Sequence, residues 1–117
     1  YDDHLLSKRT GERVKVDGTM PTMCDALMAT TPGEITWSIN SKTVDDFLVV
    51  SEDNVAHAIS YAFRYLKLIV EPGGVVALAA LLANKLEVKD KTVAIVLSGG
   101  NIDGNTFLRC LEQYPSP

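Results

Sequence analysis

The sequence Thr92-Val93-Ala94-Ile95-Val96-Leu97 runs directly into Ser98-Gly99-Gly100-Asn101. The first six residues are almost all apolar and largely β-branched, which is typical of a strand covered on both faces, and such strands belong to parallel sheets. Small residues after such a strand let a backbone approach closely, and in open α/β sheets ligands bind beyond the carboxyl ends of the strands. We therefore predict an α/β fold with a mostly parallel sheet and a ligand site near Ser98.

Helices are expected on both sides of this strand. Between residues 54 and 70, apolar side chains recur at spacings of three and four, and Ser51 is the expected N-cap. Residues 75–82 are apolar on nearly every side, as in a buried helix. Residues 103–113 are expected to form a last helix, and the charged residues 85–91 a surface loop.

Nearer the amino end, the sequence predicts strands and loops. Residues 34–39 alternate polar and apolar side chains, which is the period of a half-buried strand, and residues 47–50 form a second apolar run of strand length. Residues 1–20 are polar and charged and are interpreted as a surface connection. Residues 21–28 are interpreted as a short helix that ends at Pro32-Gly33. This mixed order of helices and strands favours the α/β class.

Composition excludes several classes of protein. The 117 residues are 46% hydrophobic and 22% charged, with 11 Lys and Arg against 15 Asp and Glu and a net charge of −4. These values suit a globular domain and exclude disordered, collagen-like and membrane-spanning chains, and the lack of a basic face argues against nucleic-acid binding. Cys24 and Cys110 lack the spacing of a zinc site or a disulfide framework, which favours reduced thiols in the cytoplasm.

Three places in the sequence are candidates for chemistry. Ser98-Gly99-Gly100 offers a hydroxyl and main-chain amides to a phosphate or a heteroaromatic ring, or it is only a tight turn that needs glycine. Glu71, between two helices, is either a carboxylate whose pKa burial would raise or a structural cap. Asp2-Asp3-His4 offers oxygen ligands to a hard cation, although adjacent carboxylates are usually just solvated. His57 is assigned to the polar face of its helix rather than to catalysis.

Three segments in fixed order resemble one enzyme family. They are Lys67-Leu68-Ile69-Val70-Glu71-Pro72-Gly73-Gly74, Ala77-Leu78-Ala79-Ala80-Leu81-Leu82 and Val96-Leu97-Ser98-Gly99-Gly100-Asn101-Ile102-Asp103. The family is the serine/threonine dehydratase group of pyridoxal-phosphate enzymes, which includes threonine ammonia-lyase and serine racemase. The resemblance spans nearly the whole chain, and the ordered combination is far more specific than any one motif.

The resemblance implies a tryptophan-synthase-β-like fold of three layers with a mostly parallel sheet. Residues 1–117 would correspond to the C-terminal portion of its large catalytic domain, with no separate regulatory domain. In relatives, the lysine that forms a Schiff base with the cofactor and the glycine-rich loop that holds the cofactor phosphate both precede this portion. This chain alone is therefore expected to be inactive.

The resemblance also assigns residues to the cofactor, pyridoxal 5'-phosphate. Ser98 matches the serine that hydrogen-bonds the pyridine nitrogen, which replaces the phosphate interpretation of this turn, and Gly99 and Gly100 provide close backbone approach. Glu71 matches a family glutamate near the cofactor. Ala26 stands in a segment beside the ring, at a position where the family usually has glycine. A neutral hydroxyl at the nitrogen gives a weaker electron sink than a carboxylate would.

A divalent-cation site is implied as well. Asp3 and the main-chain carbonyl of Tyr1 resemble two ligands of a Mg²⁺ or Ca²⁺ site found in many relatives, whose glutamate ligand would lie just before Tyr1. Oxygen ligands of this kind suit a hard cation. In this interpretation the cation stabilises structure.

The activity implied by the resemblance is β-elimination of water from L-threonine or L-serine, which gives a 2-oxo acid and ammonia. The enzyme would be a cytoplasmic homodimer whose upstream portion completes the site, with an amino acid as substrate and neither nucleic acid nor a membrane as partner. Within the family, serine racemase and a hydroxyectoine-pathway dehydratase stay open as alternatives. Of another class, a non-catalytic truncated fragment or interaction module also stays open.

Overall fold

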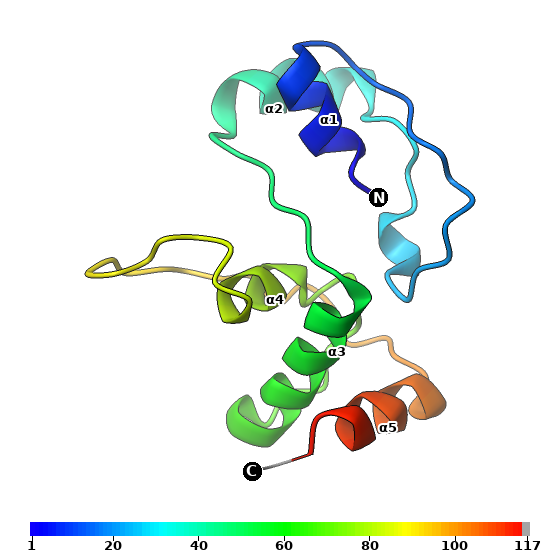
Figure 1. The fold of residues 1–117 in the computed structure, drawn as a ribbon, viewed down its shortest axis with the longest axis vertical. Helices are drawn as coiled ribbons and strands as arrows, with labels where there is room; N and C mark the ends of the chain where they lie inside the picture. Colours follow the sequence, from blue (N-terminus) through cyan, green and yellow to red (C-terminus); the bar gives the residue numbers. More distant parts are fainter. Residues whose placement is uncertain (116–117) are drawn as a thin grey trace. The chain divides into compact units, whose positions relative to one another are not determined.

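The structure is a computed structural model that describes residues 1–115. These residues form helices and connecting segments, and none of them is assigned to a β-strand. They divide into two compact units (Figure 1): the first contains residues 1–22 and 26–49, and the second contains residues 23–25 and the chain from Val50 onward. No helix in this part of the chain is long and apolar enough to cross a bilayer.

Helix α1 (Asp3–Thr10) lies in the first unit and corrects the prediction that residues 1–20 are only a surface connection. Its buried side chains are the polar Asp3 and Ser7, so hydrophobic periodicity gives no sign of the helix. The Ser7 hydroxyl accepts a 2.9 Å hydrogen bond from the Val14 N–H. Gly11, with φ of 83°, forms the left-handed cap that ends α1, and this glycine is the signal that the sequence offered.

Helix α2 (Glu34–Thr43) includes residues 34–39, so the prediction of a strand there is wrong. The alternation that suggested a strand came from Ile35 and Ile39, which are 79% and 55% exposed, together with Trp37, which is 9% exposed. One buried aromatic side chain among two exposed isoleucines fits a helix as well as a strand. The Lys8 ammonium donates hydrogen bonds of 2.9 and 2.8 Å to carbonyls at the end of α2 and fixes it to α1.

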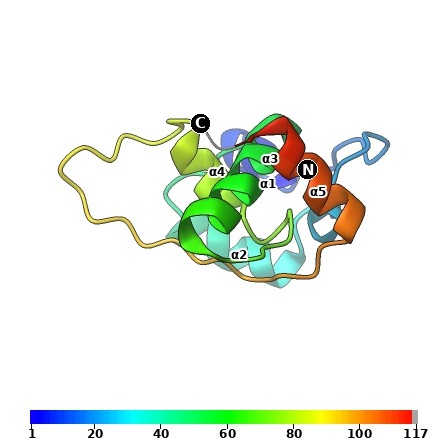
Figure 2. The same ribbon diagram turned by 90° about the horizontal axis from the view of Figure 1, so that it is seen from below.

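The second unit is built on helix α3 (Glu52–Tyr61), which continues as a π-helical turn, η2 (Ala62–Leu66). In both views α3 lies between α4 (Val76–Leu82) and α5 (Gly104–Gln113) (Figures 1 and 2). The predicted cap is confirmed, because Ser51 and Asn54 exchange side-chain-to-backbone hydrogen bonds of 3.2 Å. The predicted helix over residues 54–70 ends earlier, at Lys67, whose φ of 60° is left-handed.

The hydrophobic core belongs to the second unit. The buried helix predicted over residues 75–82 is confirmed as α4, and the helix predicted over residues 103–113 is confirmed as α5. Burial of a Val or Ile side chain stabilises a fold by about 1.5–3 kcal/mol, so α3 and α4 hold this unit together. The core side chains are those of Cys24, Val55, Ala56, Ala58, Ile59, Ala62, Val70, Val75, Leu78, Ala79 and Cys110.

Residues 47–50 and 92–97, both predicted as strands, have no strand partner within residues 1–115. Residues 84–97 run outward from α4 as a long segment without helix or strand (Figure 2). Val93 and Val96 are 40% and 77% exposed, so the prediction of a strand covered on both faces is wrong for this chain as it stands. A strand needs a hydrogen-bonded neighbour, and the described residues supply none.

The short helix predicted over residues 21–28 is only a single 3₁₀ turn, η1 (Asp25–Leu27). Just before this turn, the Met23 N–H donates a 2.8 Å hydrogen bond to the carboxylate of Glu52, the first residue of α3. This contact attaches the segment before η1 to α3. The predicted loop over residues 85–91 is confirmed.

Candidate functional site

Two of the motif segments, residues 71–74 and residues 98–101, lie side by side in the second unit. The Glu71 N–H donates a 2.9 Å hydrogen bond to the Gly99 carbonyl, and the Ser98 N–H donates a 3.3 Å hydrogen bond to the Gly74 carbonyl. The first segment is itself folded into a turn, because the Gly74 N–H donates to the Glu71 carbonyl at 3.1 Å. Backbone hydrogen bonds therefore join the two motifs that the sequence separates by more than twenty residues.

Glycine is required at this junction because the backbones approach so closely. A Cβ atom at Gly74 would lie 2.9 Å from the Gly99 nitrogen, and one at Gly100 would lie 3.0 Å from the Ile69 carbonyl oxygen. A Cβ atom at Gly99 would lie 2.5 Å from the Glu71 carboxyl group. The close approaches that the structure shows at Gly99 and Gly100 are to Glu71 and Ile69 of the same chain. The approach of these glycines to the cofactor stays a prediction.

The Glu71 carboxylate accepts a 3.0 Å hydrogen bond from the Asn101 N–H. The sequence singled out Glu71 without finding this partner, because the two residues are thirty positions apart. Neither of the two alternatives considered, a buried acid or a helix cap, describes the observed contact.

Ser98 lies at the end of the extended residues 92–97, and it is exposed. Its hydroxyl makes no hydrogen bond within residues 1–115, although its main-chain N–H is bonded. A polar side chain that is presented on a fixed backbone and has no partner is available to a ligand. Ala26, which the resemblance also assigned to the cofactor environment, is exposed and belongs to the first unit.

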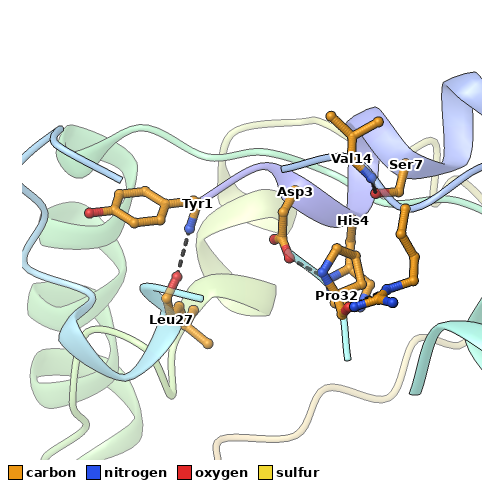
Figure 3. A network of polar contacts seen from close by, with 8 residues as sticks. Tyr1, Asp3, His4, Ser7, Val14, Leu27 and Pro32 are labelled. Carbon is orange, nitrogen blue, oxygen red and sulfur yellow. Dashed lines mark hydrogen bonds and ion pairs between the residues drawn. The ribbon is translucent and has the colours of Figure 1, made fainter. Parts of the chain in front are cut away.

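Asp3 is 5% exposed, and its Oδ2 atom has no hydrogen-bond partner. Figure 3 shows this carboxylate directed toward the His4 ring, whose Nδ1 lies 3.4 Å from Oδ2, and the Tyr1 nitrogen directed toward the Leu27 carbonyl. His4 also packs against the rings of Trp37 and Phe47. A buried carboxylate oxygen without a donor is costly unless something compensates its charge.

Tyr1 and Asp3 line one cavity of about 330 Å³ in the first unit, together with His4, Asn40 and Phe47. No group of three or more His, Cys, Asp and Glu side chains in the described part of the chain is arranged to hold a metal ion. The two ligands that the resemblance implies, one carboxylate and one main-chain carbonyl, would not by themselves form such a group. The cavity therefore supplies part of a cation site at most.

His57 lies where the sequence predicted, on the partly exposed face of α3. Its ring stacks on Tyr114, with 4.9 Å between ring centroids, and both residues line a cavity of about 260 Å³ in the second unit with Ser60, Tyr61 and Arg64. The Ser60 and Arg64 side chains are already hydrogen-bonded to main-chain carbonyls near the end of α5. These contacts support a structural role for His57 and its neighbours.

The protein-family comparison decides the family. The model described as "Pyridoxal-phosphate dependent enzyme" matches residues 2–99. This chain belongs to the pyridoxal-phosphate dependent enzyme family. The matched range includes Asp3, Ala26, Glu71, Ser98 and Gly99, so most of the candidate residues lie inside it.

Relatives within the pyridoxal-phosphate dependent family confirm the resemblance to threonine ammonia-lyase and serine racemase. The chain is 40% identical over 109 residues to the L-threonine ammonia-lyase of Thermotoga maritima. These 109 residues cover 93% of this chain and 27% of that protein. It is 34% identical over 112 residues to the serine racemase of Schizosaccharomyces pombe, covering 96% of this chain and 34% of that protein.

Solved structures of the family agree with this fold. The T.th. threonine deaminase is 35% identical with a TM-score of 0.79, covering 87% of this chain and 34% of that one. Maize serine racemase is 30% identical with a TM-score of 0.81, covering 97% of this chain and 36% of that one. The chain thus spans between about a quarter and about a third of the length of these relatives.

The residues near Ser98 fit the cofactor that gives the family its name. The Ser98 hydroxyl is exposed and available to a ring nitrogen, whereas the side-chain positions of Gly99 and Gly100 face Glu71 and the Ile69 carbonyl. The Asp3 cavity fits a cation in one respect, since Oδ2 lacks a donor. Neither observation by itself defines a reaction.

Proposed function

We propose that this chain forms the C-terminal portion of the catalytic domain of a pyridoxal-phosphate-dependent ammonia-lyase. The reaction is β-elimination of water from L-threonine or L-serine, which gives a 2-oxo acid and ammonia. The observation that carries the proposal is the unpartnered Ser98 hydroxyl on a turn whose backbone is tied to residues 71–74. The 40% identity to an L-threonine ammonia-lyase supports it.

Pyridoxal phosphate, when bound, would withdraw electrons from the α-carbon of the amino acid. Ser98 would hydrogen-bond the pyridine nitrogen, and because its hydroxyl is neutral, it would not hold a proton on that nitrogen as a carboxylate would. With Ser98 at the nitrogen the ring would withdraw electrons less strongly than with a carboxylate there, which would favour prompt loss of the β-hydroxyl. Gly99 and Gly100 would bring the backbone toward the ring, and Ala26 would lie beside it.

The rest of the enzyme would complete both the site and the sheet. Val93, Val96 and Ile69 are exposed in the second unit, and a β-branched run such as residues 92–97 is stable only with strands beside it. The relatives are about three times as long as this chain, which leaves room for those strands and for the lysine that binds the cofactor. We place the complete enzyme in the cytoplasm as a homodimer.

Asp3 would bind a divalent cation, Mg²⁺ or Ca²⁺, together with the Tyr1 carbonyl. The support is the buried Oδ2 atom without a hydrogen-bond donor, because a cation would offset the cost of burying that charge. The cation would stabilise the first unit rather than take part in the reaction.

The test uses the complete polypeptide that carries residues 1–117. With L-threonine we expect 2-oxobutanoate and ammonia, and with L-serine we expect pyruvate and ammonia. Ser98→Ala should lower turnover by about two- to tenfold, since it removes one hydrogen bond to the cofactor, whereas Ser38→Ala on the exposed face of α2 should not. Unchanged turnover in Ser98→Ala would refute the role of this hydroxyl.

Three alternatives are tested by the same assays. Serine racemase is favoured by the 34% identity to the enzyme of Schizosaccharomyces pombe, and D-serine formed faster than pyruvate would select it. A hydroxyectoine-pathway dehydratase would leave both amino acids unchanged while still binding the cofactor. A non-catalytic fragment or interaction module would show neither turnover nor the absorbance of bound cofactor.

A further inference from the structure

We infer that Glu71 is a positioning residue: its carboxylate holds the Asn101 N–H and so fixes the turn that carries the Ser98 hydroxyl. This inference rests on the proposed function for its catalytic consequence, whereas the anchoring contact itself is independent of the reaction. It differs from the expectation that Glu71 lies against the cofactor and acts on it directly.

The position of the carboxylate is the first argument. Glu71 Cδ, Oε1 and Oε2 lie 2.5, 2.5 and 2.8 Å from the place that a Cβ atom of residue 99 would occupy. The carboxylate therefore fills the space left by the missing side chain of Gly99. From there Oε2 accepts the Asn101 N–H at 3.0 Å, and a hydrogen bond to an ionised acceptor is about twice as strong as a neutral one.

The second argument is that this contact completes a set of three. The turn is held at Ser98 by the Gly74 carbonyl, at Gly99 by the Glu71 N–H and at Asn101 by the Glu71 side chain. The first two contacts are between main-chain atoms, so a substitution of Glu71 by any residue other than proline leaves their donors and acceptors in place. Only the third depends on a side chain, and that side chain is the Glu71 carboxylate, which holds the main chain at Asn101.

The third argument is that Glu71 itself is attached to a rigid support. Val70, before it, is 3% exposed, and Val75, after the Pro72-Gly73-Gly74 turn, is fully buried in the core beside α4. Buried side chains on both sides leave the main chain of Glu71 little freedom to move. The core thus fixes the main chain of Glu71, and the Glu71 carboxylate fixes Asn101. Because Asn101 and Ser98 belong to one turn, the position of the Ser98 hydroxyl follows.

The structural test measures exchange of the Asn101 amide hydrogen in the complete polypeptide without cofactor, using ¹⁵N-asparagine labelling. Glu71→Ala should raise its exchange rate by about tenfold, as expected for the loss of one hydrogen bond. Glu71→Gln keeps an acceptor oxygen at the same reach, so its rate should stay within about threefold of the unsubstituted protein. Glu112→Ala, which removes an exposed carboxylate of α5, should leave Asn101 unchanged.

The functional test is a double-mutant cycle in the holoenzyme. If Glu71 acts through Ser98, Glu71→Ala should lower kcat more than it raises KM, and it should cost less than about twofold when Ser98→Ala is already present. Glu71→Gln should recover most of the activity. If the carboxylate acted on the cofactor directly, the two alanine effects would multiply, and glutamine would be as poor as alanine.

The outcomes separate the two proposals. Unchanged Asn101 exchange in Glu71→Ala, or multiplying effects in the cycle, overturns the inference and leaves the ammonia-lyase proposal standing. Absence of turnover on either amino acid, with Asn101 exchange raised as expected, overturns the proposed function and supports the anchoring contact.

Discussion

The Ser60 hydroxyl of α3 donates a 2.6 Å hydrogen bond to the main-chain carbonyl of Tyr114, the residue that follows α5. Arg64, one turn further along, donates to the Tyr114 carbonyl at 3.2 Å and to the Leu111 carbonyl at 2.9 Å. The last carbonyls of a helix have no partner within it. In this protein α3 and η2 supply those partners and so attach α5 to the core.

Replacement of Arg64 should therefore loosen α5. We expect Arg64→Ala to lower the free energy of unfolding by about 1–3 kcal/mol, because the Leu111 carbonyl loses its Arg64 donor and the Tyr114 carbonyl keeps only the Ser60 hydroxyl of the two. Urea unfolding followed by circular dichroism measures the change. Arg109→Ala, on the exposed face of α5, is the matched control and should shift stability by no more than about 0.5 kcal/mol. Equal effects of the two substitutions would contradict this assignment.

The glycines near the two joined turns should differ in their tolerance of alanine. Gly74→Ala should be the most harmful, because its Cβ meets the Gly99 main chain, which cannot move without breaking backbone hydrogen bonds. Gly99→Ala should displace the flexible Glu71 carboxylate and cost about 1–2 kcal/mol, the value of that hydrogen bond. Gly104→Ala, with open space around it at the start of α5, should be neutral or stabilising. Thermal unfolding of the three variants checks this order.

The cap of α5 should give part of the stability a pH dependence. Asp103 Oδ1 accepts the N–H groups of Asn105 and Thr106 at 3.0 Å, and the bonds from Thr106, with a smaller contribution from Asn105, hold the pKa of Asp103 below its ordinary 3.8. Because the folded-state pKa is lowered, the stabilisation is complete above the unfolded pKa and is lost as pH falls through the folded one.

Asp103→Asn keeps an oxygen acceptor but cannot titrate, so it isolates this effect. Between about pH 5 and pH 2, the unsubstituted protein should lose more stability than the D103N variant, because the two proteins have all other titrating groups in common. Thermal unfolding at a series of pH values measures the difference. A difference that does not change with pH would show that the ionised form of Asp103 adds nothing to the cap.

Addition of Mg²⁺ or Ca²⁺ should stabilise the complete polypeptide through Asp3. A free cation concentration about one hundred times its dissociation constant would raise the free energy of unfolding by about 2.7 kcal/mol. Asp3→Asn should abolish the stabilisation, and without cation it should not be less stable, because it removes a buried charge whose Oδ2 has no donor. Asp45→Asn is the control, since Asp45 is exposed and does not line the cavity that contains Asp3. A melting temperature insensitive to both cations would remove the cation from the proposal.

The sequence predicted the second unit better than the first. Helices α3, α4 and α5 were all predicted, and for α3 and α4 the signal was the spacing of apolar residues, joined in α3 by the Ser51 cap, which are encoded within a few neighbouring residues. In the first unit, α1 buries Asp3 and Ser7, and α2 exposes two isoleucines, so the usual link between hydrophobicity and burial is reversed. Pattern reasoning fails where polar side chains face inward.

The candidate site was predicted in part. The motifs that contain Glu71 and Ser98 were recognised in order, whereas the contacts of Gly99 and Gly100 with Glu71 and Ile69 were not predicted. The partner of Glu71 was not predicted, nor was the hydrogen bond from the Met23 N–H to the Glu52 carboxylate. Every residue except proline has a main-chain N–H, so the sequence of the donor segment does not show that a carboxylate accepts a hydrogen bond from it.

The sequence by itself determined the family, the helices of the core and the residues that could meet a cofactor, because spacing, caps and ordered motifs are local properties. Only the tertiary structure decided that Gly99 lies against the Glu71 carboxylate and that Asn101, not a helix end, is the hydrogen-bond partner of that carboxylate. It also decided that residues 92–97 have no strand partner within residues 1–115. Contacts between residues far apart depend on the path of the backbone between them, and a strand exists only when a second segment offers its hydrogen bonds.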